Sequence, residues 1–116
     1  MKIENKDYTV IYLEDENRII VQGNLRLRSV EKYNEIIDFI EGHFSANAED
    51  AVLDLTKLDT LNSSGIAALG LLMIKMRDKK KMVKIIGSRY ISWQAMSLEN
   101  FKDIHSNIEI ELIVHH

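Results

Sequence analysis

Residues 51–77 constrain the fold of this chain more than any other stretch. They begin with an apolar run over 51–55 that is typical of a buried strand. A polar turn over 59–65 follows, and it leads into apolar residues at helical spacing. We therefore predict a strand, a turn and a helix. The unpaired N–H groups and the positive dipole end at the helix start favour a phosphate there.

The flanking segments predict further strands and helices. Strands are predicted where β-branched and aromatic residues gather or alternate with polar ones, at 8–13, 18–22, 82–86 and 108–114. The first two are expected to form an antiparallel hairpin, and Gly23, Asn24 and Leu25 are expected to break the second. Helices are predicted at 30–44, 64–76 and 91–101, with Ser29 as the N-cap of the first.

The predicted element order is ββαβαβαβ within a single domain spanning residues 1–116. Strands that alternate with helices indicate an α/β fold, here a mixed, mainly parallel sheet of four to five strands with about three to four helices. In such sheets functional groups collect beyond the carboxyl ends of the strands. The turn at 62–65 is predicted to lie at that edge.

Charge and composition narrow the function classes. The net charge is −3, which gives no indication of a nucleic-acid or anionic-membrane partner. No apolar run approaches the roughly 18 residues of a membrane span, and no apolar signal core is present, so a cytoplasmic protein is expected. The absence of cysteine excludes disulfides and thiolate sites. We expect no cofactor and no metal, and we leave His115 and His116 aside because they are either native or the remnant of a purification tag.

Enzymatic interpretations of the central turn are weak. Gly65 and Gly70 have the spacing of a phosphate-binding loop, but two leucines follow where lysine and a hydroxyl residue are needed. A nucleophilic Ser63 needs a histidine base, and the sequence does not place His43 or His105 beside it. We therefore expect no catalytic residues.

Two interpretations of the turn remain. In the first, Asn62, Ser63 and Ser64 only cap the helix. In the second, one serine accepts a phosphoryl group, which adds about 1.5 to 2 negative charges and changes the surface that a partner meets. The helix over 64–76 is apolar nearly all round, and part of that surface could contact another protein.

Two motifs resemble a known family. Leu53-Asp54-Leu55 followed by Leu61-Asn62-Ser63-Ser64-Gly65-Ile66 resembles the signature of STAS domains, the bacterial anti-sigma factor antagonists and their relatives. Gly23-Asn24-Leu25 is similar to the family's glycine-acidic-leucine turn. Element order and length match over essentially the whole chain. The chain departs from the family pattern at Asn62 and Asn24, where the family has acidic residues.

The resemblance implies a non-enzymatic switch. Ser63 falls on the position that a partner anti-sigma serine kinase phosphorylates, with Ser64 as the alternative, and a phosphatase reverses the modification. Asn62, Ser64 and Gly65 would shape the turn. The expected partner-binding residues are Asn24, Asp59, Leu72 and Lys75.

The alternative function keeps the same fold without phosphorylation. In that case the chain is a constitutive subunit of a larger complex, either a stress-signalling scaffold or an accessory of a lipid-transport ATPase. For either function we expect a monomer or a weak homodimer.

Overall fold

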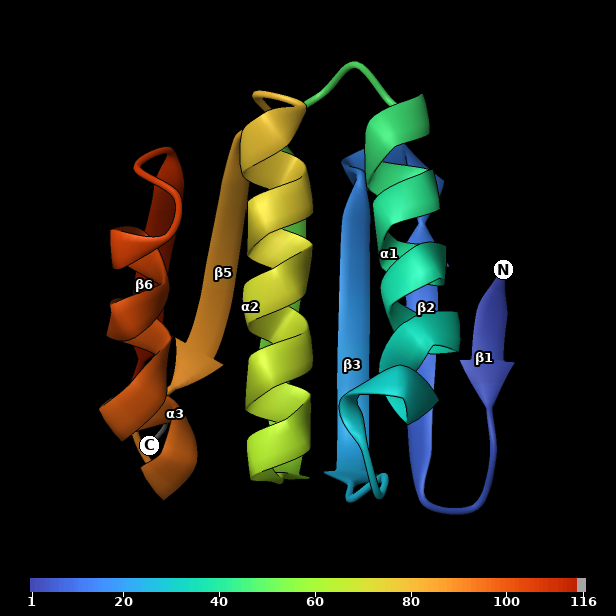
Figure 1. The fold of residues 1–116 in the computed structure, drawn as a ribbon, viewed down its shortest axis with the longest axis vertical. Helices are drawn as coiled ribbons and strands as arrows, with labels where there is room; N and C mark the ends of the chain where they lie inside the picture. Colours follow the sequence, from blue (N-terminus) through green and yellow to red (C-terminus); the bar gives the residue numbers. More distant parts are fainter. Residues whose placement is uncertain (115–116) are drawn as a thin grey trace.

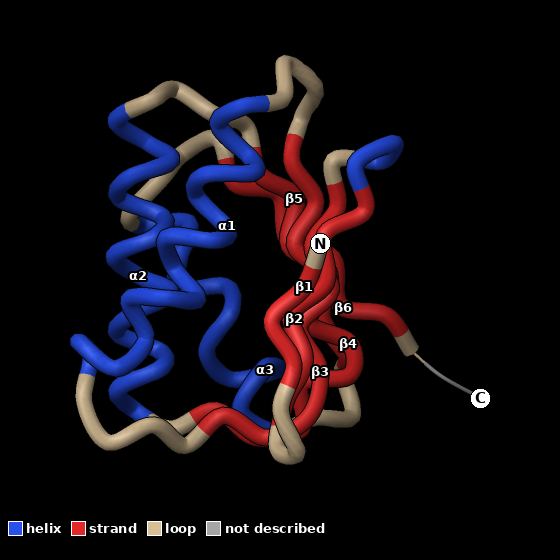
Figure 2. Tube along the Cα trace, turned by 90° about the vertical axis from the view of Figure 1, so that its right-hand side faces the viewer, coloured by secondary structure: helices blue, strands red, loops and turns tan. Residues whose placement is uncertain are grey.

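The computed structural model describes residues 1–114, which form one six-stranded sheet with helices packed on one face (Figures 1 and 2). The strands are β1 Lys2–Glu4, β2 Tyr8–Leu13, β3 Arg18–Leu25, β4 Ala51–Leu61, β5 Val83–Ser88 and β6 Ile108–Ile113. The α-helices are α1 Asn34–Ala46, α2 Ser63–Asp78 and α3 Ser92–Ser97, and the 3₁₀ turns are η1 Glu14–Glu16, η2 Val30–Tyr33 and η3 Leu98–Asp103. None of these helices is long and apolar enough to cross a membrane.

The sheet topology explains why all helices share one face. The strands lie in sequence order from β1 to β6, antiparallel up to β3 and parallel from β3 to β6. Each connection between parallel strands contains a helix and leads to the adjacent strand. These crossovers have the same handedness and progress in the same direction along the sheet, so their helices all lie on the same face. Figure 2 shows α1, α2 and α3 on one side of the sheet and no α-helix on the other face. The predicted α/β class and mixed, mainly parallel sheet are confirmed.

The core lies between the helices and the covered sheet face. β4 contributes Leu53 and Leu55, and α2 contributes Met73 and Met76, all fully buried. Phe44 of α1 is buried as well. These side chains come from the amino half of β4, the last turns of α2 and α1, and together they pack both helices onto the central strand.

The predicted break in the second strand is wrong. β3 continues through Gly23, which has a φ of +102° at a register shift opposite β4. The backbone N–H of Asn24 donates to the carbonyl of Asp7 at 2.9 Å, so the strand stays paired across the irregularity. The sequence pattern also missed β1, which is only three residues long and pairs with β2.

The helix starts differ from the prediction too. Ser29 makes no capping hydrogen bond, and the 3₁₀ turn η2 precedes α1. This turn directs Tyr33 into the core, where its side chain is 2% exposed. The helix predicted over 91–101 ends at Ser97 and continues as η3. The two terminal histidines lie outside the described residues.

Candidate regulatory site at the start of helix α2

Ser63 is the first residue of α2, directly beyond the carboxyl end of β4, and its side chain is exposed. Asn62 is the N-cap, and its Oδ1 accepts a hydrogen bond from the N–H of Gly65 at 2.9 Å. Ser63 and Ser64 make no side-chain hydrogen bond within residues 1–114. Asn62 therefore caps the helix alone, and the Ser63 hydroxyl is left open to solvent.

Asn62 also joins three segments of the chain. Its Oδ1 accepts a second hydrogen bond from the Tyr33 hydroxyl at 2.6 Å, and its Nδ2 donates to the Leu27 carbonyl at 2.7 Å. The N–H of Leu27 in turn donates to the Tyr33 hydroxyl oxygen at 3.3 Å. Burial raises the pKa of Tyr33, which keeps the phenol in its donating form. The network holds the loop after β3 against the start of α2.

This network explains why asparagine stands where the STAS-like pattern has aspartate. A carboxylate could still cap the helix and accept from Tyr33, but it has no N–H to donate to Leu27. A carboxylate oxygen of aspartate would then face the carbonyl oxygen of Leu27 at a partly buried position, with no hydrogen between them, which costs free energy. The amide at Asn62 is therefore required by this particular loop.

Gly65 permits the close approach of α2 to its surroundings. A Cβ at this position would lie 2.2 Å from Cδ1 of Leu61 and 2.8 Å from the Tyr33 hydroxyl oxygen. Any side chain would therefore displace the hydroxyl that bonds to Asn62. The turn has to carry glycine here for reasons of packing.

An apolar stripe continues from Ser63 along α2. Ser63, Ala67 and Leu71 are four residues apart and therefore lie on one helix face, and all three are exposed. A groove of about 390 Å³ runs along this face between α2 and the α3–η3 segment. Its lining residues are Ile66, Ala67, Gly70, Leu71, Ile74, Ser97, Asn100, Phe101 and Ile104. The exposed Ser63 hydroxyl and the exposed apolar surface thus share one side of the molecule.

The structure corrects one of the four residues predicted to bind a partner. Leu72 is 0% exposed and packs in the core, so it cannot contact a partner, whereas its neighbour Leu71 is 46% exposed. Lys75 is exposed and forms an ion pair with Glu41 of α1 at 3.3 Å. The other two predicted residues are exposed on neighbouring strands: Asn24 pairs with the residue after Asp59. A partner contact at these three exposed positions stays a prediction.

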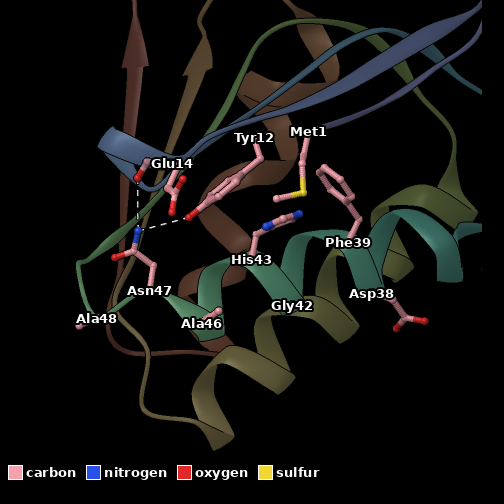
Figure 3. A pocket seen from close by; sticks show the side chains of 10 residues that line it. All are labelled: Met1, Tyr12, Glu14, Asp38, Phe39, Gly42, His43, Ala46, Asn47 and Ala48. Carbon is pink, nitrogen blue, oxygen red and sulfur yellow. Dashed lines mark hydrogen bonds between the residues drawn. The ribbon is translucent and has the colours of Figure 1, made fainter.

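The two histidines considered as bases lie elsewhere. His105 is buried after η3, with Nε2 2.8 Å from the carbonyl of Lys81, beyond the far end of α2. His43 lies in the last turns of α1, where its ring stacks on Tyr12 and lines a separate hollow (Figure 3). Within residues 1–114, no three His, Asp or Glu side chains are arranged to hold a metal ion.

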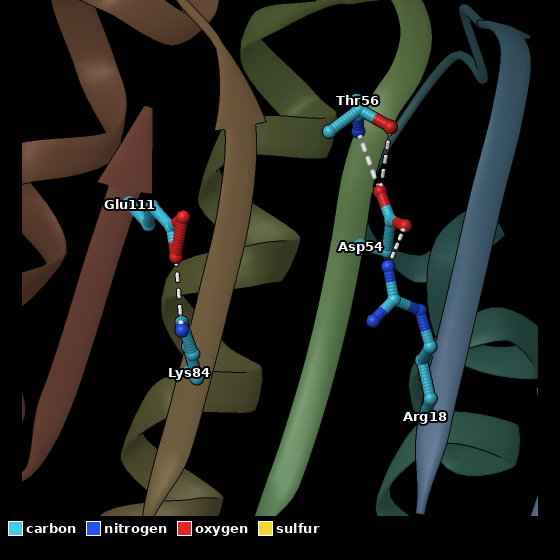
Figure 4. A network of polar contacts seen from close by, with 5 residues as sticks. All are labelled: Arg18, Asp54, Thr56, Lys84 and Glu111. Atoms are coloured by element: carbon cyan, nitrogen blue, oxygen red, sulfur yellow. Dashed lines mark hydrogen bonds and ion pairs between the residues drawn. The ribbon is translucent and has the colours of Figure 1, made fainter. Parts of the chain in front are cut away.

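Asp54, the acidic residue of the Leu-Asp-Leu motif, points to the uncovered sheet face rather than to Ser63 (Figure 4). It is 7% exposed, pairs with Arg18, and accepts hydrogen bonds from the N–H and hydroxyl of Thr56 at 3.0 and 2.7 Å. Burial acts to raise the pKa of Asp54, but the bonds from Thr56 and the charge of Arg18 outweigh it and lower the pKa. Asp54 thus joins β3 to β4.

Replacing Asp54 by asparagine is expected to reduce the free energy of unfolding at pH 7 by about 1–3 kcal/mol, because Arg18 loses its charged partner. The pKa of Asp54 in the folded protein lies below its unfolded value of about 3.9. Its ionised carboxylate therefore contributes fully to the free energy of unfolding at pH values above about 3.9. This contribution is lost as the pH falls through the folded pKa. Urea unfolding of the wild type and of Asp54→Asn between pH 7 and pH 3 measures the difference in their free energies of unfolding. This difference should become smaller as the pH falls.

Glu111→Gln is the matched control, because it removes the exposed pair with Lys84 on the same sheet face (Figure 4). This variant should unfold at nearly the wild-type denaturant concentration. If the loss of free energy of unfolding in Asp54→Asn stays constant down to pH 3, the ion pair between Asp54 and Arg18 does not account for it.

Several solved structures share this α/β fold, with its six-stranded mixed sheet covered on one face. SiaC of Pseudomonas aeruginosa superposes with a TM-score of 0.75 at 19% identity, over 99% of this chain and 98% of that one. A chain in the crystal structure of the diguanylate cyclase SiaD with its activator SiaC, from the same organism, gives 0.75 at 20% identity, covering 99% of both chains. Apo-SiaC gives 0.72 at 18% identity, over 96% and 98%.

These superpositions establish a SiaC-like fold over essentially the full length of the chain. No protein-family model matches the sequence, and no curated protein sequence does.

Proposed function

We propose that this chain is a non-catalytic regulatory domain that binds a partner protein through the exposed face of α2 and is switched by phosphorylation of Ser63. One observation carries the proposal: the exposed Ser63 hydroxyl begins the same helix face that Ala67 and Leu71 continue, beside an apolar groove. A serine placed there is accessible to a kinase and adjacent to whatever docks on the groove.

The electrostatics of the site support a switch rather than a structural serine. Asn62 supplies the cap, so a phosphoryl group on Ser63 would disturb no hydrogen bond of the fold. The start of α2 favours the added negative charge. A partner that covers the apolar stripe would instead have to desolvate that charge, which is costly. Phosphorylation should therefore leave the domain folded and weaken docking.

Two classes of partner are supported by different observations. The full-length fold likeness to SiaC, the activator of the diguanylate cyclase SiaD, supports a nucleotide-cyclase partner. The STAS-like motif supports an anti-sigma factor with serine-kinase activity and an opposing phosphatase. We place the cyclase first, because the fold likeness spans the chain whereas the motif covers a few residues and departs at Asn62 and Asn24.

The experiment measures binding of the purified domain to a diguanylate cyclase and to an anti-sigma kinase from the same organism. Ser63→Asp is expected to weaken binding by about tenfold or more, equivalent to about 1.4 kcal/mol, and Ser63→Ala is expected to retain it. Ser64→Ala, a neighbouring and partly buried serine, is the control and should also bind normally.

Mass spectrometry of the protein from its native cells tests the modification itself. A species heavier by one phosphoryl group and mapped to Ser63 is expected, and mapping to Ser64 would move the switch by one residue. If Ser63→Asp and Ser63→Ala bind like the wild type and no modified species forms, the constitutive-subunit function replaces the switch.

A further inference from the structure

A second groove lies between α1 and the β1–β2 edge of the sheet, away from the α2–α3 groove (Figure 3). Its volume of about 650 Å³ is in the range of typical ligand pockets, roughly 300–1,000 Å³. Its lining residues are Met1, Tyr12, Glu14, Asp38, Phe39, Gly42, His43, Ala46, Asn47 and Ala48. Nothing in the proposed Ser63 switch uses this groove.

Aromatic rings form one wall of the groove. The ring of His43 stacks on Tyr12, with centroids 4.2 Å apart and an interplanar angle of 22°. Phe39 meets the same imidazole edge-on at 4.6 Å and 67°. Figure 3 shows the Met1 side chain beside these rings. Tyr12 is only 8% exposed, so it is the partly exposed rings of His43 and Phe39 that offer a surface to a flat group.

Gly42 keeps the groove open. It lies inside α1, where glycine disfavours the helix relative to alanine. A Cβ at this position would meet no atom within 4 Å, so no packing within residues 1–114 requires glycine here. The space above Gly42 is therefore available to a bound group.

The acidic side chains that line the groove form no ion pair within residues 1–114. Glu14 and Asp38 line the groove, and Asp15 and Glu16 follow in the η1 turn. None of these four carboxylates forms an ion pair within the described chain, and no lysine or arginine lines the groove. The α-amino group of Met1 also makes no ion pair with them. Aromatic faces beside unpaired carboxylates attract a flat cation.

We propose that this groove docks an arginine-bearing segment of a partner protein. The guanidinium is planar, so it can stack on the partly exposed rings of His43 and Phe39 while it donates paired hydrogen bonds to Glu14 or Asp38. A lysine ammonium provides the charge without the planar face and should bind less tightly. Arginine, rather than cations in general, is therefore the expected occupant.

The probe is an acetylated and amidated hexapeptide with two arginines among glycines, titrated at low salt to about 10 mM, above the millimolar Kd of weak contacts. Amide NMR shifts are expected at Gly42, His43 and neighbouring residues. The lysine peptide should bind several-fold more weakly, and the citrulline peptide, which is planar but uncharged, should not bind. Equal binding of the citrulline peptide, shifts centred elsewhere, or no shifts with the arginine peptide would overturn the proposal.

Three variants separate docking from folding. Gly42→Met fills the open space, so it should abolish peptide binding while the melting temperature stays level or rises. Glu14→Gln with Asp38→Asn should weaken binding by roughly tenfold. Asp103→Asn with Glu109→Gln removes the same charge from exposed positions outside the groove and should leave binding unchanged. Equal losses in both double variants would indicate non-specific attraction and overturn the proposal.

Discussion

Leu72→Ala is expected to lower the free energy of unfolding by about 2–5 kcal/mol, the usual range for truncating a buried leucine. Leu71→Ala, one residue earlier on the same helix, is expected to change it by no more than about 0.5 kcal/mol. The difference arises because Leu72 is fully buried against the core, whereas Leu71 is 46% exposed at the α2–α3 groove. Chemical denaturation of the two variants measures it directly.

The same pair separates stability from docking. If the α2 face binds the partner, Leu71→Ala should weaken binding by several-fold although the domain remains as stable as the wild type. A Leu71→Ala protein that is destabilised as much as Leu72→Ala would show that Leu71 is also packed in the core. If the Leu71→Ala protein is stable and binds the partner normally, Leu71 is not part of the docking surface.

Gly23→Ala is the second substitution with a large expected effect. Gly23 has a φ of +102°, and a Cβ there would lie 2.3 Å from the carbonyl oxygen of Asp7 and 2.9 Å from Cα of Tyr8. Both contacts are to backbone, so only a shift of the β2–β3 pairing could relieve them. We expect a loss of at least about 2 kcal/mol, combining backbone strain with overpacking.

Gly42→Ala is the control for that measurement, because its Cβ would enter open space inside a helix. Its free energy of unfolding should rise by about 0.5–1 kcal/mol. Thermal or urea unfolding measures the stability of both glycine variants. A Gly23→Ala protein as stable as the wild type would contradict the close backbone packing described for Gly23.

The position of the candidate site was predictable because it depends on local pattern. The apolar run of β4, the polar turn and the apolar α2 are contiguous, and a helix start at the carboxyl edge of a parallel sheet follows from them. The hydrogen bonds of Asn62 were not predictable. They join it to Tyr33, 29 positions away, and to Leu27, 35 positions away. No periodicity carries information about such contacts.

The sequence by itself determined the α/β class, the succession of β3, α1, β4, α2, β5 and β6, and the turn that bears Ser63, since apolar spacing reports which elements form. Only the tertiary structure decided which side of α2 is exposed. That helix is apolar nearly all round, so its pattern has no polar face to set its orientation, and Leu71 and Leu72 look alike until the sheet and α1 cover one of them. The second groove likewise exists only because folding brings Tyr12 of β2 beside His43 of α1.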